Sequence, residues 1–180
     1  MAYTEDELNL LSTVPQLIGS AIASASGSGL FGTGKELFAN ANAILEGLKS
    51  YAGNTLIKQL LPDPKEDRAA AVEKMKKTRD WAMARLKAKG IDNAEKLRAQ
   101  TLEDARAAAS ILAARATASE AEEYRQWALS IAERVATAAT EGGFLGFGGE
   151  RVSPAEKSLI DDIRKTGARI MGLDDPTAKM

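Results

Sequence analysis

The chain contains neither cysteine nor histidine. Without cysteine it can form no disulfide, no thiolate metal site and no thiol nucleophile. Without histidine it lacks the commonest general base and the commonest zinc ligand. No arrangement of the remaining residue types points to a catalytic centre, so we expect a protein that is not an enzyme.

Charge of one sign and long apolar runs are also lacking. The 24 basic and 25 acidic residues leave a net charge of −1, so the field of the whole molecule favours neither nucleic acid nor an anionic membrane. No run of 18 apolar residues is present to span a bilayer. The start, MAYTEDELNLL, is acidic and lacks the basic region of a signal peptide. We expect a cytoplasmic protein that does not bind nucleic acid.

Alanine is abundant, strand-forming residues are sparse, and charges recur at helical spacing, which predicts an all-α fold. A length of 180 residues suits one domain, which can bury roughly 70% of the surface that the unfolded chain exposes. The sequence therefore predicts a single globular domain of about seven helices.

Local signals predict where several helices begin and end. Thr4 and Glu7 form a capping box at the first helix, and Pro15 is expected to kink or divide that helix. Asp63-Pro64 predicts a helix start, Gly90 a helix end, and Thr101–Asp104 a second capping box. Long final helices are predicted over residues 119–140 and from the capping box Ser153–Glu156 onward.

A glycine-rich stretch, GSGLFGTGKE, has the G-x-x-x-x-G-K spacing of a phosphate-binding loop at Gly29, Gly34 and Lys35. Such a loop needs a preceding buried strand and a Ser or Thr after the lysine, whereas here Glu36 would repel phosphate. A similar stretch recurs at residues 143–150, with glycine in place of the lysine. We therefore predict no nucleotide site, but two helix–glycine loop–helix units, about 5–50 and 119–172, which bracket a charged segment, 63–116.

Both loops carry large apolar side chains between their glycines: Leu30, Phe31, Phe144, Leu145 and Phe147. Each such side chain gains roughly 1.5–3 kcal/mol on burial. In one interpretation the side chains fold back and close the end of the core. In the other they stay exposed as a docking patch for a protein partner or for a membrane surface.

Residues 140–175, TEGGFLGFGGERVSPAEKSLIDDIRKTGARIMGLDD, resemble the second half of TerB-type domains, a helical family associated with tellurite resistance. The resemblance extends over about residues 131–175; Ser153–Lys157 is similar to the family's helix start and Gly172–Asp174 to its helix end. It implies a cytoplasmic interaction or stress-response protein, with a divalent-cation site as an alternative. The acids placed to hold a cation would be Glu141, Glu150 and Glu156, but we interpret them first as solvated carboxylates at helix ends.

Two further patterns lie on the predicted helices. Lys74, Lys77, Trp81 and Arg85 form a basic face with one aromatic residue, which we interpret as a solvated face with a half-buried tryptophan. A second stripe belongs to the core: Tyr124, Trp127, Ile131 and Val135. The function expected from the sequence is thus a non-enzymatic interaction module with a protein partner. The alternatives are a membrane-surface protein that inserts its loops and a cation binder.

Overall fold

The all-α prediction is confirmed. The computed structural model describes residues 2–25, 43–63, 65, 67–141 and 154–170, with the backbone alone for residues 68, 139–141 and 166–170, and these ranges hold helices and turns but no strand. The helices are α1 (Glu5–Ala25), α3 (Thr55–Leu60), α4 (Arg68–Ala88), α5 (Ala94–Arg115), α6 (Ala118–Glu141) and α7 (Pro154–Ile170). Residues 43–50 are helical as well. The repeat of two helix–loop–helix units stays a prediction.

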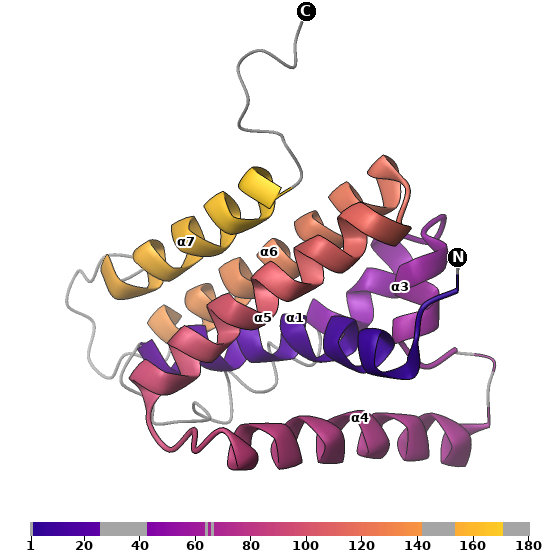
Figure 1. Ribbon diagram of the computed structural model, residues 1–180, viewed down its shortest axis with the longest axis horizontal. Coiled ribbons are helices and arrows are strands. Elements are labelled where there is room, and N and C mark those ends of the chain that lie inside the picture. The colour runs from indigo at the N-terminus through magenta and orange to yellow at the C-terminus, as the bar shows by residue number, and fades with distance from the viewer. Residues whose placement is uncertain (1, 26–42, 64, 66, 142–153, 171–180) are drawn as a thin grey trace, which may run out of the picture.

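Helix α1 is the centre of the bundle and contacts every other labelled helix. Helices α5 and α6 cover it together, α7 packs across both of them, and α4 runs along the opposite side of the molecule (Figure 1). Among the labelled helices, the backbone of α4 approaches only that of α1. Helix α4 is therefore the peripheral member of the bundle.

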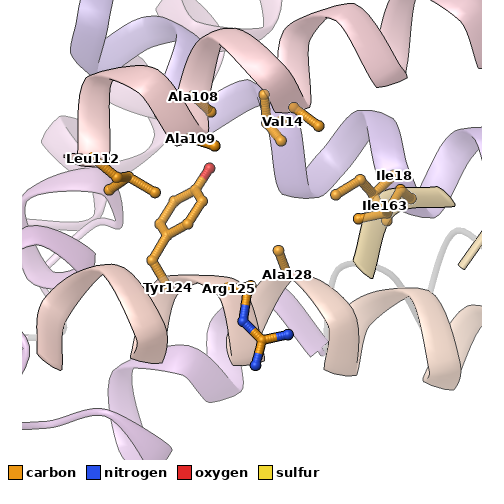
Figure 2. Close-up of a pocket in the computed structure, with 10 residues that line it drawn as sticks. Val14, Ile18, Ala108, Ala109, Leu112, Tyr124, Arg125, Ala128 and Ile163 are labelled. Atoms are coloured by element: carbon orange, nitrogen blue, oxygen red, sulfur yellow. The ribbon is translucent and has the colours of Figure 1, made fainter. Parts of the chain in front are cut away.

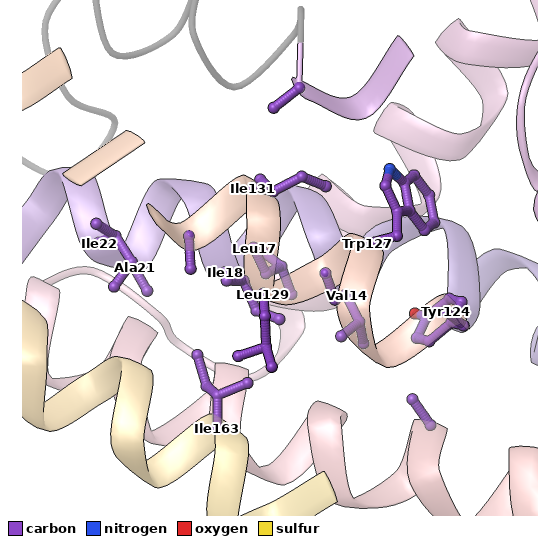
Figure 3. Close-up of a cluster of buried hydrophobic side chains, with 14 of the residues drawn as sticks. Val14, Leu17, Ile18, Ala21, Ile22, Tyr124, Trp127, Leu129, Ile131 and Ile163 are labelled. Carbon is purple, nitrogen blue, oxygen red and sulfur yellow. The ribbon is translucent and has the colours of Figure 1, made fainter. Parts of the chain in front are cut away.

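The core lies where α1, α6 and α7 meet (Figure 3). Leu11, Val14 and Ile18 recur at helical spacing along α1, and all three are buried. The stripe predicted on α6 is confirmed as core, since its four members are at most 3% exposed: Tyr124, Trp127, Ile131 and Val135. Burial of these side chains accounts for the packing of α1 against α6.

Pro15 neither ends nor divides α1, which continues through it from Glu5 to Ala25. A proline inside a helix cannot donate to the carbonyl four residues earlier, here that of Leu11. The Tyr124 hydroxyl of α6 donates to this carbonyl instead, at 2.8 Å. The helix thus keeps its proline because a neighbouring helix supplies the missing donor.

The capping predictions have mixed outcomes. The Thr4–Glu7 box is confirmed by reciprocal bonds of 2.7 and 3.2 Å. The box predicted at Thr101–Asp104 is wrong, since both residues lie inside α5, which begins after the cap residue Asn93. The start predicted at Asp63 is wrong too. There the carboxylate accepts from the amide of Lys65 in a turn, and α4 begins five residues later.

Residues 43–50 pack closely against α6 through a glycine. A Cβ added at Gly47 would lie 2.5 Å from Nε1 of Trp127, a ring that is 1% exposed. The same Nε1 donates to the carbonyl of Ile44 at 3.3 Å. Only glycine allows this approach, which places Leu45 at the surface beside α3 and α4.

Helix α1 is, within the described ranges, long and apolar enough to cross a membrane by length and composition. The expectation that nothing spans a bilayer considered only unbroken apolar runs. In the bundle, 61% of the 18-residue apolar stretch of α1 is buried. The core helix of a globular protein has these same properties, so this finding does not decide where the protein resides.

Candidate functional site

Most residues predicted to form a site lie outside the described part of the chain. These are Leu30, Phe31, Phe144, Leu145, Phe147 and Glu150, and Glu141 is described only as the last residue of the α6 backbone. Glu156 lies in the first turn of α7 and is 1% exposed, so its interpretation as a solvated carboxylate is wrong. Among the described residues, no three acidic side chains are grouped so that they could hold a metal ion. The loop surface and the cation site both stay predictions.

The described surface has its strongest charge on α4. This helix carries seven basic and two acidic residues, a net charge of +5, in a chain whose net charge is −1. Its sequence gives almost no amphipathic pattern, and Leu86 is its one buried large hydrophobic side chain. Apolar burial alone therefore does not explain how α4 is held.

A buried charge pair attaches α4 to α5. Arg85 forms two hydrogen bonds with the carboxylate of Asp104, one of them from Nη2 at 2.6 Å. Asp104 is completely buried and also accepts from Nε2 of Gln100 at 2.7 Å. The hydrogen bonds that Arg85 donates to Asp104 raise the pKa of Arg85 above its ordinary value. The guanidinium lies over the Trp81 ring, 5.6 Å from its centre, so this residue both stacks and pairs.

Two lysines complete the attachment of α4. The ammonium of Lys74 donates to the carbonyls of Gln59 and Leu61, at 2.9 and 3.0 Å, and so satisfies the carboxyl end of α3. Lys89 pairs with Glu103 of α5 at 2.9 Å, and this hydrogen bond holds the pKa of Glu103 below its ordinary value.

The basic face read from the sequence is therefore not a single solvated surface. Lys74 and Arg85 bind within the protein, as their hydrogen bonds show, and Trp81 is half-buried as expected. Of the four residues in that pattern only Lys77 is exposed; the other three are half-buried.

A groove of about 200 Å³ lies between α4 and the bundle. Its walls come from α1, residues 43–50, the end of α3 and α4, and its lining residues are Ser12, Gln16, Ile44, Leu45, Leu60, Leu61, Pro62, Lys74, Met75 and Thr78. Leu45 and Met75 are 44% and 54% exposed. The groove is thus an apolar hollow with an ammonium group and a few hydroxyl and amide groups in its wall.

The exposed large hydrophobic side chains of the described surface all lie at this groove or on α4: Leu45, Val72, Met75 and Met83. Such residues are common singly on protein surfaces, but their concentration in one place is typical of an interaction site. The sequence analysis missed this surface, because the apolar residues of α4 show no regular helical moment that would mark one face.

A second hollow, of about 40 Å³, lies where α1, α5, α6 and α7 meet (Figure 2). Aliphatic side chains and the Tyr124 ring make most of its wall, and Arg125 lies at its edge, paired with Glu122. It is large enough for a water molecule but far below the roughly 300–1,000 Å³ of small-molecule sites. We interpret it as a packing gap between alanine-rich helices.

Comparison with known proteins identifies no relative: no family model, no curated protein and no solved structure matches this chain. The resemblance to TerB-type domains therefore stays a prediction from residues 131–175.

Proposed function

We propose that this protein is a non-enzymatic interaction module that binds a protein partner at the groove beside α4. The observation that carries this proposal is an apolar hollow lined by two of the exposed large hydrophobic side chains of the described surface, Leu45 and Met75. The other two, Val72 and Met83, lie on the neighbouring helix α4. Their burial against a partner would remove apolar surface from water, which drives most protein association. An interaction role of this kind is also what the resemblance to cytoplasmic TerB-type domains implies.

The shape of this surface favours a protein over a membrane. Leu45 and Met75 line a hollow with walls from four segments, and the flat surface of a bilayer does not fill a hollow of this kind. Polar groups line the same wall, such as the Ser12 hydroxyl. The main chain or side chains of a partner can form hydrogen bonds with them. Apolar lining with a few placed polar groups is typical of a site that binds a defined shape.

Site-specific photo-crosslinking in the organism that carries the protein tests this proposal. A crosslinking amino acid is placed at position 45 or 75, and the control carries it at Lys165, an exposed position on α7. We expect the same protein to be captured from positions 45 and 75 but not from 165, and the capture from position 75 to be lost when Leu45→Ser is added. Capture of no protein, or of the same set from all three positions, would contradict a docking site here.

A further inference from the structure

We propose that the partner segment bound beside α4 is an amphipathic α-helix with acidic residues next to its apolar face. This inference rests on the proposed function and adds the chemistry of the partner. The observations behind it are the spacing of the exposed apolar residues on α4, the size of the groove and the unpaired charge around it.

The exposed residues of α4 form a stripe at helical spacing. Val72, Met75, Arg79 and Met83 follow one another at i, i+3, i+7 and i+11. The three apolar members are 57%, 54% and 48% exposed, in that order, and the Arg79 side chain is 65% exposed. Eleven residues of helix span about 16 Å. The stripe thus offers apolar contacts at both ends of a straight run of three turns, with Arg79 between them, which one face of a second helix can match.

The groove lies beside the amino-terminal part of this stripe and shares Met75 with it. Its volume of about 200 Å³ is below the usual range of small-molecule sites, roughly 300–1,000 Å³, but it can accept a few aliphatic side chains. Helices that dock in grooves insert such side chains from positions i, i+3 or i+4, and i+7. Met75 is an adaptable part of the wall for this purpose, because an unbranched thioether changes shape easily.

The charge around the stripe selects an acidic partner. Lys76 and Lys87 flank the stripe, are exposed and form no ion pair within the described part of the chain. The two acids of α4 offset only a part of this charge, since Asp80 pairs with its neighbour Arg79 and leaves Glu73 alone against the lysines. A helix with Asp or Glu beside its apolar positions would be attracted, whereas a basic helix would be repelled.

Selection from a randomised library of helical peptides, with the full-length protein as the target, tests this inference. Only peptides that bind the native chain and lose binding to the Met75→Ser variant are kept. We expect their sequences to be enriched in Asp and Glu next to apolar residues at i, i+3 or i+4, and i+7. For one such peptide we expect replacement of its Glu by Gln, or Lys76→Glu in the protein, to weaken binding by about 10-fold, whereas Lys165→Glu changes it little.

Three outcomes would overturn the inference. The first is a set of Met75-dependent peptides that are neutral or basic. The second is that no peptide depends on Met75, even though positions 45 and 75 crosslink to a partner. The docking site at the groove would then be supported, but the proposal of an acidic helical partner would be wrong. The third is binding of phosphatidylglycerol vesicles that is lost in Val72→Ser and Met75→Ser without any peptide being selected, which would make α4 a membrane-binding helix. Failure of crosslinking as well would overturn the proposed function itself.

Discussion

The hydroxyl of Tyr124 donates to the main-chain carbonyl of Leu11 at 2.8 Å, in the buried contact between α6 and α1. In a regular helix this carbonyl would accept from the amide of residue 15, which is proline here. A buried carbonyl without a donor costs about 1–3 kcal/mol. One tyrosine therefore allows a proline in the central helix, so the two positions should be energetically coupled.

Tyr124→Phe and Pro15→Ala, separately and together, measure this coupling. We expect Tyr124→Phe alone to lower the free energy of unfolding by about 1–3 kcal/mol, because it removes the only side-chain donor to the Leu11 carbonyl within the described residues. In the Pro15→Ala background the main-chain amide of residue 15 can donate to that carbonyl. Tyr124→Phe should therefore lower the free energy of unfolding by less in this background. Urea unfolding of the four proteins gives the coupling energy. Additive effects would show that the hydroxyl does not replace the missing amide.

The tyrosines also predict a loss of stability in alkaline solution. Burial raises the pKa of Tyr124 far above its ordinary value of 10.0, and burial followed by nearby carboxylates raises the pKa of Tyr3 and Tyr51. A raised native pKa gives a contribution that is complete below the unfolded pKa and is lost as the pH rises, since the unfolded state then releases protons that the native state keeps. We expect the free energy of unfolding to fall above about pH 10.

Tyr124→Phe provides the control for this alkaline effect. It removes the most strongly shifted phenol, so the decline of unfolding free energy with pH should be less steep in the variant than in the native chain. The difference in tyrosinate absorbance between the two proteins, followed during unfolding, isolates Tyr124 from Tyr3 and Tyr51. An equal slope in both proteins would mean that Tyr124 does not titrate with unfolding.

Much of the fold could be predicted from local patterns. The Thr4–Glu7 box and the stripe of Tyr124 and Trp127 depend on residues within a few turns of one another, and both are confirmed. The pattern at Thr101–Asp104 misleads for a physical reason. The same residue types that cap a helix also bind at a distance, and Asp104 accepts from Arg85, 19 residues away. A local pattern cannot distinguish these two uses of a carboxylate.

The candidate groove could not be predicted, because the sequence of α4 has almost no amphipathic pattern and does not show which side of the helix faces the bundle. Val72, Met75 and Met83 are exposed, while Lys74 and Arg85 bind to the bundle. The weak hydrophobic pattern of α4 predicts neither orientation of the helix. The polar contacts fix how α4 is rotated about its own axis, and these contacts depend on α3 and α5.

The contact between Gly47 and Trp127 predicts a strong effect of one methyl group. Gly47→Ala should lower the free energy of unfolding by about 1–3 kcal/mol, since the buried indole cannot move away and the gain in helix propensity is smaller. Gly53→Ala is the matched control, because no atom lies within 4 Å of a Cβ at that position. Thermal and urea unfolding of both variants measure the difference. Equal stabilities would show that residues 43–50 can shift away from α6 at little cost.

The Arg85–Asp104 pair predicts that α4 can be loosened without disturbing the core. Asp104→Asn keeps the shape of the side chain but removes its charge, and hydrogen bonds to charged groups contribute about 1.5–3 kcal/mol. Glu103→Gln removes a neighbouring carboxylate that is 61% exposed, and should cost at most about 1 kcal/mol. We expect hydrogen exchange to speed up in α4 in the first variant and to change little in the second, with α1 and α6 protected in both.

A double replacement separates the charge from the packing at this contact. In a Gln100→Met background, which lacks the buried amide that donates to Asp104, Arg85→Met with Asp104→Leu replaces the pair by apolar groups of similar volume, and such replacements are often neutral or stabilising. If the pair serves mainly to set the rotation of α4, the double variant should unfold as cooperatively as the native chain while crosslinking from position 75 is reduced. Unchanged crosslinking would show that Lys74 and Leu86 suffice to present Met75 at the groove, and that the buried charges have no part in positioning it.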